Sequence, residues 1–334
     1  MRRLALVGCL FACAEWRMAP TFPEQAAGRP VIHEQAVVGL SAAGDLAVVQ
    51  LLDADGEAPG LALLAFGRGG EPTRTLLEAP PERAMAVTRR IRATGHQPAP
   101  LLGPLVALEW PDAIGRAAQL GYAPHAPEKP AADGATWRVT GVREAGALPL
   151  LIRASQVEGP APAVALLLSD LVPGLDVELV RMPVAGAPFT PELWMQAGVV
   201  WLLAGSVMAG EPLHRAVGLR RALLSRGEAR LHDLHGLAAI ASSELEAARR
   251  EFGRAIAADP TYAEGLYDAA VAAATAGRAE EAVDLLRRAA ALDPIRVQVR
   301  GRNDEALAAL RRRADVRALL GMQRLPPEGM PPPP

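Results

Sequence analysis

Cysteine is the residue that this sequence most nearly lacks. Only Cys9 and Cys13 occur among its 334 residues, and nothing after position 13 is a cysteine. A disulfide inside the folded body is therefore excluded, and so is a zinc site built from four cysteines or from two cysteines and two histidines. The place of the two cysteines directs attention to the amino-terminal segment.

Lysine, aromatic residues and net charge are also scarce. Lys129 is the single lysine, aromatic residues make up 4% of the chain, and the net charge is −2. A catalytic or phosphate-binding lysine elsewhere is excluded, and no basic surface for nucleic acid is indicated. Half of the residues are hydrophobic and 22% are charged, so the chain can form about two domains, each with its own core.

The first thirteen residues have the pattern of an export signal. Met1, Arg2 and Arg3 precede an apolar run at 4–12, and positions 10–13 read LFAC. This resembles the lipobox of bacterial lipoproteins, in which the cysteine is lipidated and becomes the new amino terminus. The resemblance implies a signal peptide at 1–13, lipidation of Cys13 and a linker at 14–30. By the same resemblance, to enteric lipoproteins, Ala14 rather than Asp after the cysteine implies an outer-membrane lipoprotein that faces the periplasm. Its lipid would be its only contact with the membrane.

Other interpretations of this segment stay open. Cys9 follows LVG, which matches the lipobox better residue by residue, but only five apolar residues, at 4–8, would precede that cysteine, too few for a signal peptide. The triplet at 12–14 also fits an A-x-A site for ordinary signal peptidase. A cytoplasmic protein that starts with an apolar strand or helix would show the same run.

Short apolar runs between turn residues fill positions 31–188. The runs at 36–40 and 45–52 flank a turn at 41–44 and predict a hairpin. Helical spacing occurs at 81–94 and 111–120, and further strands are predicted at 60–66, 73–78, 136–143, 148–156, 163–169 and 175–182. This pattern predicts an antiparallel, β-rich α+β domain, and strand–turn pairs this few do not indicate a β-propeller.

A repeat with a period of about 34 residues follows. Ala248, Phe252, Ala255 and Pro260 recur as Ala282, Leu286, Ala289 and Pro294, with Gly236 and Gly277 at matching helix and turn positions. These residues resemble the tetratricopeptide repeat, in which small residues let paired helices approach closely and proline ends the second helix. The resemblance implies repeats at 229–262 and 263–296.

The segments on either side of the repeats complete the predicted helical domain, which spans 190–322. Residues 297–322 resemble the degenerate end of a repeat stack, and 191–208 with 212–225 are predicted as a further helix pair. The run at 193–210 has no charged residue, and we interpret it as a buried helix rather than a membrane span. The proline-rich tail at 323–334 is predicted to be disordered or extended.

No catalytic, cofactor or metal motif accompanies this architecture. His232 and His235 are the only histidines close in sequence, and the pattern favours structural roles for them over a metal site. The turn at 53–56 starts like a calcium loop but lacks its later acidic ligands. We therefore expect no cofactor and no metal.

The resemblance also implies a partner and a place for it. Tetratricopeptide repeats hold a peptide or protein in a groove lined by their first helices, which here corresponds to Arg230, Asp233, Leu237, Glu264, Tyr267 and Val271. We expect a non-enzymatic scaffold that binds a protein partner, in an envelope lipoprotein. Two alternatives stay open: an enzyme whose domain at 31–188 is catalytic and uses the repeats for docking, and a cytoplasmic scaffold.

Overall fold

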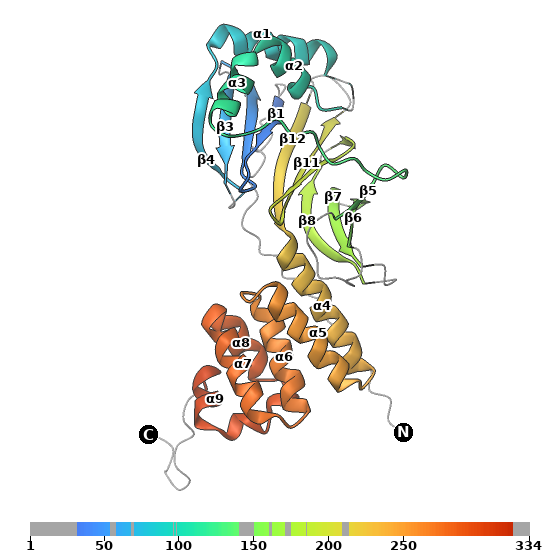
Figure 1. Cartoon of the computed structure of the whole chain (residues 1–334), viewed down its shortest axis with the longest axis vertical. Helices are drawn as coiled ribbons and strands as arrows, with labels where there is room; N and C mark the ends of the chain where they lie inside the picture. The colour runs from blue at the N-terminus through green and yellow to red at the C-terminus, as the bar shows by residue number, and fades with distance from the viewer. Residues whose placement is uncertain are drawn as a thin grey trace, which may run out of the picture.

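The computed structural model has two sheets followed by a group of helices (Figure 1). It describes residues 32–53, 58–67, 70–95, 97, 99–139, 150–159, 162–170, 175–184, 186–208 and 214–322. The predicted α+β class is confirmed, with antiparallel-rich sheets first and helices at the carboxyl end. The predicted signal peptide, Cys13, the linker and the tail at 323–334 lie outside the described residues.

The larger sheet runs in the order β10-β11-β12-β1-β2-β3-β4, and β9 pairs with β11. Its strands are β1 (Ile32–Leu40), β2 (Leu46–Asp53), β3 (Gly60–Phe66), β4 (Pro72–Glu78), β9 (Ala187–Pro188), β10 (Glu192–Gln196), β11 (Val199–Met208) and β12 (His214–Leu223). The predicted hairpin is confirmed as β1–β2. All neighbours are antiparallel except β1 and β12, which run parallel and bring the two halves of the sheet together.

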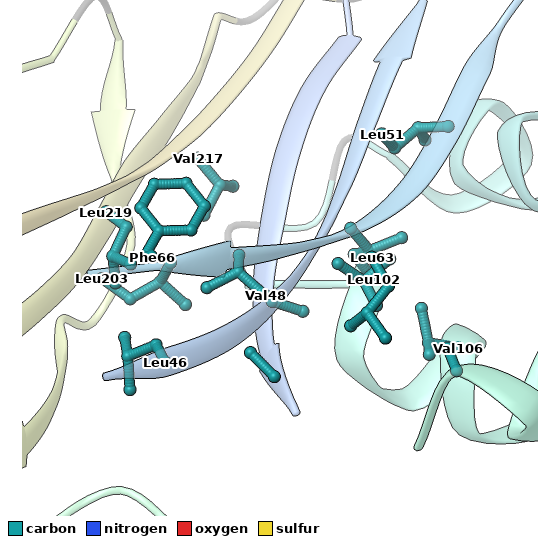
Figure 2. Close-up of a cluster of buried hydrophobic side chains, with 14 of the residues drawn as sticks. Leu46, Val48, Leu51, Leu63, Phe66, Leu102, Val106, Leu203, Val217 and Leu219 are labelled. Atoms are coloured by element: carbon teal, nitrogen blue, oxygen red, sulfur yellow. The ribbon is translucent and has the colours of Figure 1, made fainter. Parts of the chain in front are cut away.

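Three helices pack against the β1–β4 half of this sheet: α1 (Pro81–Thr94), α2 (Leu102–Glu109) and α3 (Pro111–Gln119). Figure 2 shows the core that they share, with Leu63, Leu102 and Val106 in one group. In the same core, Phe66 of β3 lies near Leu203 of β11. A single hydrophobic core therefore joins strands that are far apart in sequence.

The smaller sheet has the order β5-β6-β7-β8 and is wholly antiparallel. Its strands are β5 (Thr136–Arg138), β6 (Leu151–Val157), β7 (Ala163–Ser169) and β8 (Val177–Pro183). Ile152 and Leu166 of this sheet share a core with Val200 and Leu202 of β11. The smaller sheet therefore packs on the β11 part of the larger one.

The prediction of helices across 190–223 is wrong, because β10, β11 and β12 occupy this region and the helices begin at Leu224. Alternate residues of β11 enter two different cores: Trp201 and Leu203 enter the core under α1–α3, and Val200 and Leu202 enter the core of the smaller sheet. A strand that is buried on both faces is a continuous apolar run, which periodicity does not distinguish from a buried helix.

A buried ion pair fastens the parallel junction of β1 and β12. Arg215 Nε donates to Glu34 Oε1 at 2.5 Å, and both side chains are fully buried. Arg215 also donates to backbone oxygens of the segment before α2, and Glu34 accepts from the backbone N–H groups of Leu101 and Leu102. Burial raises the pKa of Glu34, and the neighbouring Arg215 opposes that rise. Both members of this pair have further polar partners, which buried charges require.

The helical region contains α4 (Leu224–Ala241), α5 (Leu245–Ala258), α6 (Ala263–Thr275), α7 (Ala279–Leu292), α8 (Pro294–Gly301) and α9 (Ala314–Leu319), with 3-10 turns at Glu305–Leu307 and Leu310–Arg312. The helices α5 and α7 have 14 residues each. Both ends of α5 are separated from those of α7 by one sequence period, and so are the last residues of α4 and α6. The predicted helix stops at the two Asp-Pro pairs are confirmed, because α5 and α7 end directly before them.

Candidate partner-binding surface

The sequence-predicted groove residues lie on α4 and α6, but they differ in accessibility. Leu237 is exposed, whereas Val271 and Glu264 are partly exposed. Asp233 and Tyr267 are buried, at 4% and 0% exposure. The six predicted positions therefore do not form one open surface, and Asp233 and Tyr267 are not accessible to a partner.

The first half of α4 packs against the smaller sheet as well as against the other helices. Arg230 Nη1 donates to the backbone oxygen of Glu178 in β8 at 2.8 Å, so this predicted groove residue is bound to the smaller sheet. Leu231 is buried in the core of that sheet, and a Cβ on Gly227 would collide with Leu179. The start of α4 is thus fixed by the sheet that it packs on.

The two neighbouring histidines have separate partners. His232 Nδ1 lies 2.9 Å from Glu251 of α5, and His235 Nε2 lies 2.7 Å from Asp170, directly after β7. Among the described residues no group of three or more His, Cys, Asp or Glu side chains could hold a metal ion. The histidines connect α4 to its neighbours on two sides.

Residues of α4, α6 and α8, with two from the adjoining turns, form a connected polar cluster, which we name the α4–α6–α8 cluster. Its members are Asp233, Tyr262, Glu264, Tyr267, Asp268, Arg296, Arg300 and Asp304. Arg300 is at its centre: its guanidinium lies 4.3 Å from the Tyr267 ring centroid, and its Nη2 donates to Asp268 Oδ1 at 2.8 Å. Tyr267 OH donates to Asp304 Oδ2 at 3.0 Å. The buried Tyr267 therefore packs under Arg300 and holds Asp304, two residues of the cluster.

Asp233 is the least satisfied member of the cluster. Its Oδ2 accepts a 3.2 Å hydrogen bond from Tyr262 OH, but its buried Oδ1 has no hydrogen-bond partner among the described residues. Burial, followed by the charges of Asp268 and Glu264, raises the pKa of Asp233 to about 8. Burial also raises the pKa of Asp268 to about 6, against the opposing effect of Arg300. A buried carboxyl oxygen without a hydrogen-bond partner costs free energy of folding. Carboxyl groups with strongly raised pKa values are concentrated at functional sites.

Glu264 is the accessible carboxylate of the cluster. It lies 3.0 Å from Arg296 Nη1 and 3.5 Å from Arg300 Nη1, and its side chain is 39% exposed. Both arginines come from α8 and remain partly exposed. The outer layer of the cluster therefore presents charges of both signs to solvent.

Sequence reasoning placed three members of this cluster and missed five. Tyr262, Asp268, Arg296, Arg300 and Asp304 were not predicted. The two arginines come from α8, whereas the resemblance assigned the surface to α4 and α6 alone. A signal was present in the spacing. The acids 264 and 268, and the arginines 296 and 300, are each four positions apart, which places each pair on one helix face.

No family model matches this chain, and no curated protein matches it significantly. Among the described residues, no helix is both long and apolar enough to cross a membrane.

Proposed function

We propose that this protein is a non-enzymatic scaffold that binds a protein partner across the face formed by α4, α6 and α8. In this proposal α4–α5 and α6–α7 are two tetratricopeptide-like repeats, and α8 begins a degenerate third unit. The observation that carries the proposal is the recurrence of helix ends at the same period as the sequence repeat.

The side chains between paired helices support this assignment. A Cβ on Gly236 would lie 2.6 Å from the Phe252 ring, so the first pair needs glycine opposite a large side chain. One sequence period later the corresponding positions are Ala270 and Leu286, both fully buried in one core. A larger side chain on one helix allows only a smaller one on its partner, as close packing requires.

The polar cluster supports the choice of face. Glu264 and its two arginine partners are all partly exposed, so their ion pairs contribute little to folding and the carboxylate stays within reach of a partner. Leu237 and Val271 occupy equivalent positions of α4 and α6 and add apolar surface to the same helices. A partner segment that combines a basic side chain with apolar ones fits this combination.

Site-directed photocrosslinking tests the proposed face in living cells. A benzoylphenylalanine at Leu237 or Val271 should give a discrete adduct, whereas the same group at the exposed Leu108 of α2 should not. Glu264→Arg should abolish the adduct, because it reverses the accessible charge of the cluster. Glu246→Arg is the matched control, since Glu246 is an exposed acid on α5, away from the cluster. Adducts of equal yield at position 108, or adducts insensitive to Glu264→Arg, would overturn the proposed face.

The proposed cellular place is the bacterial envelope, with Cys13 as the lipid-anchored residue. Metabolic labelling with a palmitate analogue should label the protein, and Cys13→Ser should remove the label. Cys9→Ser is the matched control and should leave the label in place. An unlabelled wild-type protein would contradict the lipoprotein assignment, and a label lost only with Cys9→Ser would move the anchor.

A further inference from the structure

An open surface pocket of about 590 Å³, which we name the arginine cavity, lies beyond α8, where the chain folds into 3-10 turns and α9. Its lining residues are Arg302, Ala308, Arg311, Arg312, Arg317, Gly321 and Met322. Arginine supplies most of this lining, and none of the lining residues is acidic. The volume lies in the range of small-molecule sites, which are concave and hold a few converging polar groups.

Backbone carbonyl groups hold three of the four guanidinium groups in place. Arg302 donates to the oxygens of Leu320 and Gly321 at 2.9 and 3.1 Å. Arg311 Nη1 donates to the oxygens of Gly301 and Asp304, and Arg317 Nη1 donates to that of Arg312 at 2.6 Å. These hydrogen bonds orient the side chains, but a carbonyl group does not neutralise a positive charge.

The charges of the cavity stay unbalanced within the described part of the chain. None of the four arginines forms an ion pair with a described carboxylate, although arginines nearby do. The adjacent Arg313 is the clearest contrast, because it pairs with both Glu280 and Asp315. Arg312 is exposed, and its side chain has no hydrogen bond to any described residue. Hydrogen bonds to carbonyl groups therefore orient Arg302, Arg311 and Arg317, whereas Arg312 makes no side-chain hydrogen bond that would give it a structural role within the described part of the chain.

We propose that this arginine cavity is a binding site for a small polyanion whose charge is carried by phosphate or carboxylate oxygens. Guanidinium groups have a planar set of donors that matches both kinds of oxyanion, and they hold their charge at every physiological pH. Four of them around one cavity repel each other, and an anion of two or more charges relieves that repulsion. None of these four arginines belongs to the α4–α6–α8 cluster, although Arg311 reaches the backbone oxygen of its member Asp304. The proposed anion site therefore adjoins that cluster, but it uses different charged side chains.

Isothermal titration calorimetry of the full chain with two probes, pyrophosphate and citrate, tests this inference. We expect saturable binding of at least one probe with one site per chain, and the preferred probe tells phosphate from carboxylate ligands. Arg312→Ser should weaken binding at least tenfold, because it removes the guanidinium that has no other partner among the described residues. Arg288→Ser is the matched control, since Arg288 is also an exposed arginine without a hydrogen bond to a described residue, on α7.

The circular dichroism spectrum of both variants should equal that of the parent chain, because neither side chain forms a hydrogen bond or an ion pair within the described part of the chain. Absence of binding for both probes would overturn the inference. So would an equal loss of affinity in the two variants, which would indicate diffuse attraction to surface arginines rather than a site.

Discussion

Two buried carboxyl groups, Glu34 in the larger sheet and Asp233 in the helical region, differ in how far their oxygens are satisfied. Glu34 and Arg215, in the larger sheet, are fully buried and use their polar atoms on each other and on the backbone. Asp233, in the helical region, is also buried but keeps an oxygen without a partner among the described residues. A fully satisfied buried polar network makes a fold rigid and specific, whereas an unsatisfied buried polar atom costs free energy. The pair of Glu34 and Arg215 therefore has a structural role, and the proposed function lies in the cluster that contains Asp233 and the accessible Glu264.

Breaking the closed pair should have the largest effect on stability. Arg215→Met leaves Glu34 buried and unpaired, so we expect a loss of about 3–5 kcal/mol in the free energy of unfolding, measured by urea denaturation. Arg153→Met breaks the exposed pair with Asp176 and should cost less than about 1 kcal/mol. Similar losses in the two variants would contradict the structural role of the buried pair.

Substitution of Gly236, where α4 contacts α5, should have the second largest effect on stability. Gly236→Ala forces a methyl group against the Phe252 ring and should destabilise the protein by about 1–3 kcal/mol. Gly253→Ala is the control in α5, where a Cβ meets nothing within 4 Å, and should stabilise by up to about 1 kcal/mol. Thermal unfolding of both variants separates packing from helix propensity. A neutral Gly236→Ala would show that these helices are less closely packed than described.

The open carboxyl group should make the stability of the protein depend on pH. Asp233 binds its proton up to about pH 8 in the folded state but only up to its ordinary value of 3.8 when unfolded. Asp233 therefore contributes to the free energy of unfolding at low pH, and this contribution is lost as the pH rises from 3.8 to about 8. Asp233→Asn should reduce that loss by on the order of 1 kcal/mol between about pH 5 and pH 8, measured by urea denaturation at each pH. Asp284→Asn, at an exposed position of α7, should leave the pH dependence unchanged. Equal pH dependence in the parent and Asp233→Asn would show that Asp233 is not protonated.

The smallest effect is expected at the turns between paired helices. Gly277 adopts a φ of 75° after α6, and Ser243 adopts a φ of 63° at the equivalent position after α4. Because serine is strained in this region, Ser243→Gly should stabilise the protein by about 0.5–1 kcal/mol. Gly277→Ser should destabilise it by a similar amount. Opposite shifts of the melting temperature would verify that the two turns are equivalent, and shifts of the same sign would contradict it.

The two regions also differed in how far the sequence predicted them. Local patterns placed α1 and the strands β3 and β7 correctly, because turn residues bound each of them. The same patterns did not reveal that β12 pairs with β1, since that contact joins Ile32 to Arg215 near opposite ends of the two-sheet region. In the helices, a fixed period made the ends of α5 and α7 predictable.

The region 190–223 shows the physical limit of periodicity. Ala197 and Gly198 both have positive φ and form the two-residue turn of a hairpin between β10 and β11. That Ala-Gly pair was the available signal, but alanine rarely adopts positive φ and so did not mark a turn. In the candidate site, Glu264 and Asp233 were predicted from the repeat. The arginines opposite Glu264 were missed, because α8 starts only at the end of the second predicted repeat and was not expected to line the groove.

The helix α4 has a mechanical consequence. It continues directly from β12 at Leu224, gives Leu231 to the core of the smaller sheet, and packs along α5 with its remaining length. At about 1.5 Å per residue, its 18 residues form a stiff rod about 27 Å long, and no linker separates this rod from β12. The helical region therefore cannot rotate freely relative to the sheets. A partner bound to the helices would be held in a fixed orientation relative to the sheets.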